Sequence, residues 1–139
     1  MSAIDIVKAL DEQISGGDLE KAGDYMADGF NFVGVGPEPL GKQETLGVWG
    51  ALRAAMPDFN HNMSNFREAH NIVYGTVEVT GTHTGTLAIP GGPQLAPTNR
   101  KFRNPLERVA ITVHDGKVTE WVVEQVPGGG VPGILGQLS

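Results

Sequence analysis

The sequence predicts an α+β domain in which one face of an antiparallel sheet packs on N-terminal helices. Helical periodicity is confined to the part of the chain before Pro57, and a run of long strands follows from residue 59 onward. Within that run, every even position from Thr76 to Thr86 is Thr or Glu. The odd positions therefore form the inward face of a strand, and the even positions form the face that meets water.

Three helices are expected before Pro57. The first covers residues 2–15, where Ser2 is placed to cap it with Asp5 and apolar residues recur at helical spacing: Ile4, Val7, Leu10 and Ile14. The second runs from the capping residue Asp18 to about Ala27. The third covers 41–56 and ends at Pro57, because residues before a proline avoid helical angles.

The strands are expected over these segments: 30–35, 59–69, 72–88, 101–114 and 117–126. Asp115-Gly116 between the last two is a strong signal for a tight hairpin turn. A loop rich in proline and glycine is predicted over 89–99. The tail begins with a flexible glycine run, 128–130, and ends with a small apolar group: Ile134, Leu135 and Leu138.

The bulk composition fits one globular domain spanning 1–139. The formal charge of −6 argues against nucleic acid and anionic membranes as partners, because both need a basic surface. The chain has no cysteine, which excludes disulfides, a thiolate nucleophile and cysteine metal sites. No leader peptide or membrane span is recognised in the sequence, so a cytoplasmic location is expected.

His83 is the residue that breaks the apolar register of the central strand. One interpretation is a core histidine that is hydrogen-bonded to a neighbour. The other is a cavity histidine acting as an acid, a base or a polar anchor, since its ordinary pKa lies near neutrality. Gly81 and Gly85 remove side-chain bulk on the same inward row, which favours the second interpretation because it leaves room for a ligand.

Two glutamates are further candidates. Glu107 begins an inward row with Val109, Ile111 and Val113, and it is either a surface charge or a carboxylate looking into the cavity. Glu124 is either a buried base or an ordinary solvated residue, because both faces of the last strand are mixed. His61, His70 and His114 do not have the spacing of a metal site, so no metal is expected.

Several short motifs resemble the SnoaL-like polyketide cyclase family, within the nuclear transport factor 2-like, cystatin-like superfamily. They are GTHTGTL (81–87), APTNRKF (96–102), HDGKVTEW (114–121) and GILGQLS (133–139), with a GPEPL turn (36–40) before the third helix and Pro57-Asp58 after it. The resemblance covers nearly the whole chain in the right order.

The resemblance implies a cone in which a strongly curved antiparallel sheet wraps around the helices and an apolar pocket opens at one end. Cyclases of this family close a ring by intramolecular aldol condensation, without a metal or an organic cofactor. An aspartate on the last strand is the acid and base. Homo-oligomers are common, so a homodimer or homotetramer is expected.

Carried over by motif, the family's histidine matches His83, whereas its catalytic aspartate falls on Val123. The slot two residues later, which is acidic in some relatives, holds Gln125. The family's pocket glutamine falls on Glu107, and its pocket histidine falls on Val109. Its pocket asparagine falls on Phe32, with Asn31 one residue away. Valine and glutamine cannot move a proton at neutral pH, so the aldol mechanism does not transfer unchanged.

Two functions are therefore considered, both with a hydrophobic small molecule as the partner. The first is a cofactor-independent cyclisation or isomerisation of a carbonyl compound, with His83 transferring the proton together with Glu107 or Glu124. Trp49 would close the pocket from the helix side. The other residues expected to bind the substrate are Asn31, Phe32, Val109, Ile111, Trp121, Val123 and Gln125. The second is a non-catalytic binding protein that uses the same cavity. In a third, weaker reading the pocket is filled by its own side chains and the chain serves only assembly.

Overall fold

The computed structural model describes every residue of the chain except Pro93, which lies inside the loop predicted over 89–99 and is outside the described residues. The described residues form these elements in chain order: α1 (Ala3–Ile14), α2 (Leu19–Asp24), β1 (Met26–Val33), α3 (Lys42–Ala55), β2 (Ser64–Ala69), β3 (Ile72–Val77), β4 (Thr80–Thr82), β5 (Leu87–Ala88), β6 (Gln94–Leu95), β7 (Lys101–Arg103), β8 (Glu107–His114), β9 (Lys117–Val123) and α4 (Gly130–Leu138). The predicted α+β class is confirmed.

The first helix begins as its sequence predicts. The Ser2 hydroxyl accepts a hydrogen bond from the Asp5 backbone N–H, and the Asp5 carboxylate accepts one from the Ser2 N–H. The far end of α1 is tied to α3, because the Arg53 guanidinium donates to the carbonyls of Gln13 and Ile14, both at 3.1 Å. This contact holds the two helices together at the residues where α1 ends.

The main sheet has the strand order β1-β9-β8-β3-β2. All neighbouring pairs are antiparallel except β1 and β9, which run parallel. The expectation of a wholly antiparallel sheet is therefore corrected to a mixed sheet. The reason lies in the connection: α3 follows β1, so no hairpin forces β1 to run against its neighbour.

Two predicted strands are broken into shorter ones. The segment 72–88 divides into β3, β4 and β5, because after Val77 the backbone leaves β8 and pairs with Asn60 and His61 instead. The segment 101–114 divides at Pro105, which has no N–H for a sheet ladder. The strand expected from 59 begins only at Ser64, after Asn62 adopts a positive φ of 49°.

Other boundaries also differ from the expectations. The second helix ends at Asp24, and β1 already begins at Met26. The tail, expected to begin flexibly, is the helix α4 from Gly130 onward. The hairpin between β8 and β9 forms as predicted, with φ values of 50° at Asp115 and 76° at Gly116, which are typical of the primed turns that join antiparallel strands.

A β-bulge in β9 explains why alternation did not reveal which face of this strand is buried. Val113 pairs with Val118, whereas Thr112 pairs with Glu120, so the register shifts between these pairs. As a result both Val118 and Trp121 are buried, although they lie three positions apart. A bulge of this kind reverses the inward and outward positions along a strand.

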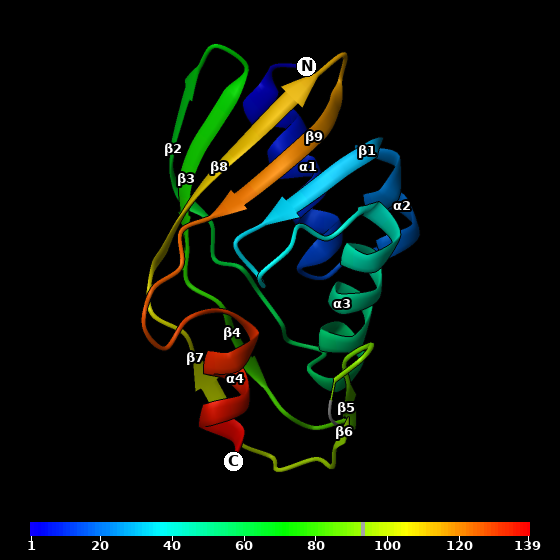
Figure 1. Cartoon of the computed structure of the whole chain (residues 1–139), viewed down its shortest axis with the longest axis vertical. Helices are drawn as coiled ribbons and strands as arrows, with labels where there is room; N and C mark the ends of the chain where they lie inside the picture. Colours follow the sequence, from blue (N-terminus) through cyan, green and yellow to red (C-terminus); the bar gives the residue numbers. More distant parts are fainter. Residues whose placement is uncertain (93) are drawn as a thin grey trace.

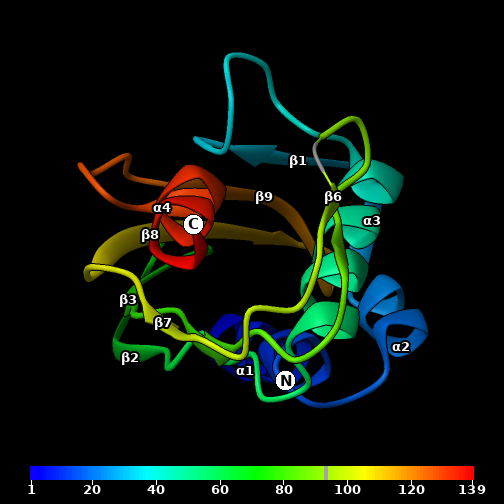
Figure 2. The same cartoon turned by 90° about the horizontal axis from the view of Figure 1, so that it is seen from below.

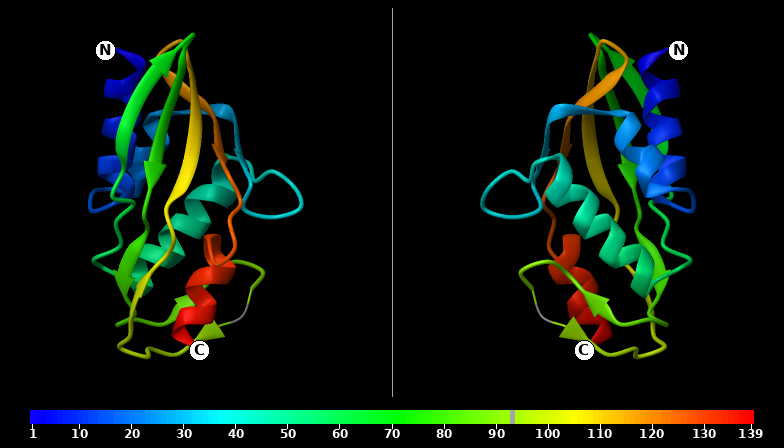
Figure 3. Two further views of the ribbon diagram at one scale, coloured as in Figure 1. Left: turned by 90° about the vertical axis from the view of Figure 1, so that its left-hand side faces the viewer. Right: turned by 90° about the vertical axis from the view of Figure 1, so that its right-hand side faces the viewer.

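The sheet and the helices enclose the core between them. Seen from below, β1, β9, β8, β3 and β2 curve around one side while α1 and α3 close the other (Figure 2). The helix α4 lies at the lower end beside β7, far from the N-terminus (Figures 1 and 3). Among the described residues, no helix has the length and apolar character needed to cross a membrane.

Candidate active site

A cavity of about 350 Å³ lies between α3, the inner face of the sheet and the start of α4. Most of its lining is apolar, and its polar side chains among the described residues are His61, Asn104 and Glu107. The apolar lining comes from four parts of the chain: from the β1 region Phe32, Val35 and Leu40; from α3 Val48, Trp49 and Leu52; from the strands and loops Phe59, Val77, Val79, Ile89, Pro90, Trp121 and Val123; and from α4 Val131, Pro132 and Ile134. We call this space the apolar cavity.

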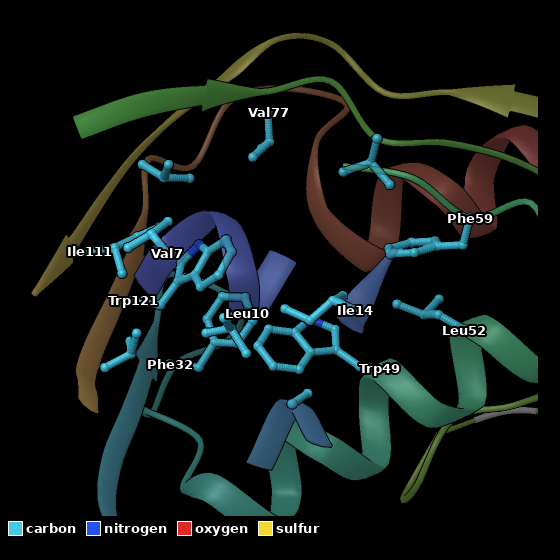
Figure 4. Close-up of a cluster of buried hydrophobic side chains, with 14 of the residues drawn as sticks. Val7, Leu10, Ile14, Phe32, Trp49, Leu52, Phe59, Val77, Ile111 and Trp121 are labelled. Carbon is cyan, nitrogen blue, oxygen red and sulfur yellow. The ribbon is translucent and has the colours of Figure 1, made fainter. Parts of the chain in front are cut away.

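Aromatic rings form one wall of the apolar cavity. The ring centroids of Phe32 and Trp49 are 5.6 Å apart, those of Phe32 and Trp121 are 6.0 Å apart, and the two indoles are 5.7 Å apart. Figure 4 shows these three side chains in contact below a central space, with Val77 on the opposite side and Phe59 at one end. Tilted and edge-on contacts at such distances are favourable and hold the rings in place.

His61 joins this wall as the polar ring. Its centroid lies 5.4 Å from that of Phe59 and 5.5 Å from that of Trp121, and its exposed fraction is 5%. The Nδ1 atom lies 2.7 Å from Oδ1 of Asp11 on α1. An ionised carboxylate can only accept, so Nδ1 carries the proton and the neutral imidazole has its lone pair on Nε2.

The backbone also holds His61 firmly. Its N–H donates to the Ser15 hydroxyl at 3.2 Å, and its carbonyl accepts from the Glu78 N–H at 2.8 Å. Asp11 is mostly buried as well, with its side chain 16% exposed. The imidazole and its carboxylate partner thus form a fixed Asp11–His61 pair at the edge of the apolar cavity.

Glu107 is the acid inside the same cavity. Only 4% of the residue is exposed, and Oε1 accepts a hydrogen bond from the Gly130 N–H at 3.3 Å. Burial raises the pKa of the Glu107 carboxyl above its ordinary value, and the Gly130 N–H and nearby His61 offset this only in part. A carboxyl group in this setting is suited to holding and donating a proton.

The strand pairing explains why His61 and Glu107 serve one cavity. Glu107 pairs with Val77 across β8 and β3, and the next residue, Glu78, hydrogen-bonds to His61. The two groups are therefore on neighbouring backbone segments on either side of residues 77–78. Both contribute to the lining of the apolar cavity.

A second hollow, of about 430 Å³, adjoins the apolar cavity. Its described lining is rich in glycine and comprises Gly34, Val35, Gly36, Glu107, Gln125, Val126, Gly128, Gly129, Gly130, Pro132 and Gly133. The two spaces share Val35, Glu107, Gly130 and Pro132. We call this hollow the glycine cleft, and Glu107 stands where the two meet.

His83 is buried but does not occupy the place expected for it. The ring has no exposed surface, and Nδ1 accepts from the Thr98 N–H at 3.2 Å with the Thr98 hydroxyl at 2.9 Å. His83 is not among the described residues that line the apolar cavity or the glycine cleft. Its placement is thus that of a core histidine bonded to a neighbour, and the expectation that it faces the cavity is corrected.

Gly81 and Gly85 do not open the space for a ligand that the sequence predicted. A Cβ atom on Gly85 would lie 2.7 Å from the Ala54 carbonyl oxygen, and one on Gly81 would lie 2.8 Å from the Phe102 ring. These glycines therefore allow the end of α3 and the Phe102 side chain to pack closely, and they do not leave room for a ligand.

Glu124 also lies away from the cavity. It is exposed and forms a two-pronged ion pair with Arg108, at 2.6 Å and 3.0 Å, which lowers the pKa of the Glu124 carboxyl. Of the two alternatives for Glu124, the solvated one is confirmed and a buried catalytic base is wrong, because β9 has ended at Val123 and the side chain is exposed.

The predicted wall residues divide into two groups. Phe32, Trp49, Trp121 and Val123 line the apolar cavity, as expected. The others do not: Asn31 is exposed, Gln125 borders the glycine cleft and donates to the Gly34 carbonyl at 3.1 Å, and Val109 and Ile111 are buried in the core without being among the described lining residues.

The Asp11–His61 pair was missed from the sequence, where His61 was weighed only as a metal ligand. One signal was available. Asp11 follows Val7 by four residues and precedes Ile14 by three, which places a carboxylate on the apolar face of α1. Asn104 was missed too, and it is held by bonds to the Gly130 carbonyl at 3.0 Å and to Gln137 at 3.0 Å. Within the described part of the chain, no three His, Asp or Glu side chains gather as metal ligands.

A family model for SnoaL-like polyketide cyclases matches residues 4–126. The chain belongs to this family. A search of curated proteins found no significant match for this SnoaL-like chain.

Solved structures share the fold of this SnoaL-like chain. A candidate SnoaL-like polyketide cyclase from Jannaschia sp. CCS1 is 14% identical, with a TM-score of 0.76 over 99% of this chain and 91% of that one. IdmH, a candidate polyketide cyclase from Streptomyces antibioticus, is 24% identical, with a TM-score of 0.70 over 89% of this chain and 91% of that one. A cystatin-fold protein from Novosphingobium aromaticivorans is 17% identical, with a TM-score of 0.68 over 90% and 99%.

Proposed function

We propose that this chain catalyses a cofactor-independent proton transfer at a carbon next to a carbonyl group, as a step in the cyclisation or isomerisation of a hydrophobic, polyketide-like compound. The observation that carries the proposal is the 2.7 Å bond between Asp11 and His61 at the edge of an apolar cavity that also contains the buried acid Glu107. Membership of the SnoaL-like family supports the class of reaction.

In the proposed reaction His61 is the general base. Its Nε2 takes the proton from the carbon, while the Asp11 carboxylate holds the ring and stabilises the imidazolium that forms. The C–H electron pair moves toward the carbonyl, whose oxygen gains negative charge. Glu107 in its protonated form donates a hydrogen bond to that oxygen.

The enolate can then react in either of two balanced ways. Return of the proton from His61 to another carbon of the conjugated system gives an isomer. Attack of the enolate carbon on a second carbonyl of the same molecule forms a carbon–carbon bond and a new alkoxide, which takes its proton from Glu107 or His61. Neither route needs an oxidant, a reductant or a second substrate.

The lining supports a hydrophobic substrate. Phe32, Trp49 and Trp121 form an aromatic wall, with rings tilted against one another, that offers apolar contact to a fused-ring compound. The cavity volume lies in the range of small-molecule sites. In the resemblance drawn above, the family's catalytic aspartate falls on Val123, which lines this cavity with a side chain that cannot carry a proton. The proton-transfer role is therefore assigned to His61, on a different part of the fold.

The experiment is deuterium incorporation into a bicyclic aromatic ketone, α-tetralone, in D2O, followed by NMR at the carbon beside the carbonyl. The native chain is expected to accelerate exchange above the buffer rate, and His61→Gln to reduce that acceleration by about a hundredfold or more. His83→Gln is the matched histidine control and should retain exchange. Exchange no faster than buffer in the native chain, or exchange retained in folded His61→Gln, would overturn the proposal.

A binding protein for a lipophilic compound is the second candidate, favoured by the hydrocarbon side chain at Val123 and the apolar character of the lining. Calorimetric binding of α-tetralone without any catalysed exchange would select this function over catalysis.

A further inference from the structure

We propose that Glu107 makes this site selective by charge, so that its ligand carries no anionic group and is either uncharged or cationic. The inference rests on the proposed function in using the same cavity, but it concerns binding and does not require turnover. Glu107 borders both the apolar cavity and the glycine cleft, so a ligand that spans the two spaces lies against its carboxyl group.

The charged groups around the apolar cavity do not offer a free cation. Its described lining includes His61 but no lysine or arginine, and His61 is already paired with the Asp11 carboxylate. Two carboxylates, Asp11 and Glu107, thus stand against one imidazole. With both carboxylates ionised, the local charge is −1 when the imidazole is protonated and −2 when it is neutral. Protonation of Glu107, as in the proposed reaction, makes these values 0 and −1, so the ionised form of Glu107 is the one that discriminates against anions.

Four cationic side chains on the surrounding elements are engaged elsewhere. Lys42 donates to the Met26 carbonyl at 3.2 Å, and Arg53 is bound to the last carbonyls of α1. On the outer surface Arg108 pairs with Glu124, and Arg103 pairs with Glu78 at 3.1 Å. A ligand carboxylate in the cavity would therefore lack the positive partner that a buried anion requires.

The glycine-rich backbone does not replace that partner. The N-terminus of α4 would be a natural place for an anion, but the Gly130 N–H already donates to the Glu107 carboxylate. The Gly129 and Gly133 N–H groups donate to the carbonyls of Val126 and Gly129, at 3.0 Å and 3.1 Å. The protein's own carboxylate thus already occupies the Gly130 N–H at this helix terminus.

A second carboxylate in this low-dielectric space would be repelled by Glu107 or would have to bind with an extra proton. Either route weakens binding of the acid relative to an uncharged compound of the same shape. A ligand ammonium group, in contrast, would face Glu107 beside the aromatic wall, where both the carboxylate and the ring faces attract it.

The test is calorimetric titration of the native chain with three matched ligands at about pH 8, where ordinary carboxyl groups are ionised. The ligands are naphthylacetic acid, its methyl ester and naphthylethylamine. The ester and the amine are expected to bind, and the acid to bind at least about tenfold more weakly than the ester. In Glu107→Gln the acid should gain affinity toward that of the ester, and the amine should lose affinity.

Glu124→Gln is the matched control, because it removes a carboxylate of the same size that is exposed and does not line either space. It should leave all three affinities unchanged. Acid binding as strong as ester binding in the native chain, or discrimination that persists unchanged in folded Glu107→Gln, would overturn the charge-selectivity proposal.

The outcome for the proposed function is separate. Selective binding of the ester without catalysed exchange of α-tetralone would remove the enzymatic proposal and leave the charge selectivity in place. Catalysed exchange together with acid binding as strong as ester binding would remove the charge selectivity and leave the enzymatic proposal in place. Failure of all three ligands to bind would overturn both, because the cavity would then not accept a fused-ring compound.

Discussion

The Asp11 carboxylate and the His61 imidazole meet at 2.7 Å, although the two residues are 50 positions apart in the chain. One comes from the apolar face of α1 and the other from the segment that precedes β2. Their contact fixes the tautomer of His61, with the lone pair on Nε2 available to a ligand. A substitution at Asp11 therefore tests the role given to His61.

Asp11→Asn is expected to lower the rate of α-tetralone exchange by about ten- to a hundredfold, less than the loss in His61→Gln. Asparagine can still hold the ring but cannot stabilise the imidazolium, so the loss should be in the exchange rate at saturation and not in the affinity. Asp18→Asn, at the exposed cap of α2, is the control for an Asp-to-Asn change. Equal rates in Asp11→Asn and the native chain would contradict the role given to this pair.

His83→Ala is expected to lower the free energy of unfolding by about 2 to 4 kcal/mol while the exchange chemistry survives in the folded fraction. The substitution leaves a space in the core and removes the acceptor of the Thr98 N–H. Urea titration measures the stability, and the NMR exchange assay measures the chemistry. Loss of exchange with unchanged stability would return His83 to the active site.

The change in unfolding free energy caused by Glu107→Gln is expected to be more favourable at about pH 8 than at about pH 3. The pKa of Glu107 is raised in the folded chain, so the native state holds this proton more tightly than the unfolded state. Unfolding free energy is then lost as pH rises from the unfolded pKa through the folded one, and glutamine removes that loss. Thermal melting at the two pH values measures the difference.

Glu124→Gln is expected to show the opposite pH dependence in the same melting experiment: it should destabilise the fold more at about pH 8 than at about pH 3. The ion pair with Arg108 lowers the pKa of Glu124, so its contribution is present above the unfolded pKa and disappears as pH falls. Because the pair is exposed, the effect should be small. A common sign for the two variants would contradict the burial assigned to Glu107.

Gly85→Ala is expected to lower the free energy of unfolding by about 1 to 3 kcal/mol, because its new Cβ would meet the Ala54 carbonyl oxygen at 2.7 Å. Gly36→Ala is the control, since a Cβ there meets nothing within 4 Å. Urea unfolding measures both. A Gly85→Ala chain of native stability with weakened ligand binding would instead support a ligand beside this residue.

The amide protons of α4 are expected to exchange more slowly when methyl naphthylacetate is bound. Gly130, Val131 and Ile134 line the apolar cavity, so a ligand would add contacts to a helix that closes one end. Hydrogen-exchange mass spectrometry of the free and bound chain measures this. Unchanged protection of 127–138 would contradict contact between the bound ligand and α4.

The sequence by itself determined the fold class and the inward rows. The first helix, the turn at Asp115-Gly116 and the burial of Val77 and His83 follow from local capping, turn chemistry and periodicity. The sequence left Glu107 open between a surface charge and a carboxylate in the cavity. The family resemblance followed as well, because short motifs kept their order along the chain.

Only the tertiary structure decided which inward residues share a cavity. Alternation places His83 on the inward face, but it does not say that Thr98 binds the His83 ring. It also does not show that His61 is the histidine that Asp11 and the aromatic wall surround. A bulge in β9 and the parallel pairing of β1 depend on contacts between distant segments. Local pattern fixes the direction of a side chain, whereas its partners depend on how the sheet curves around the helices.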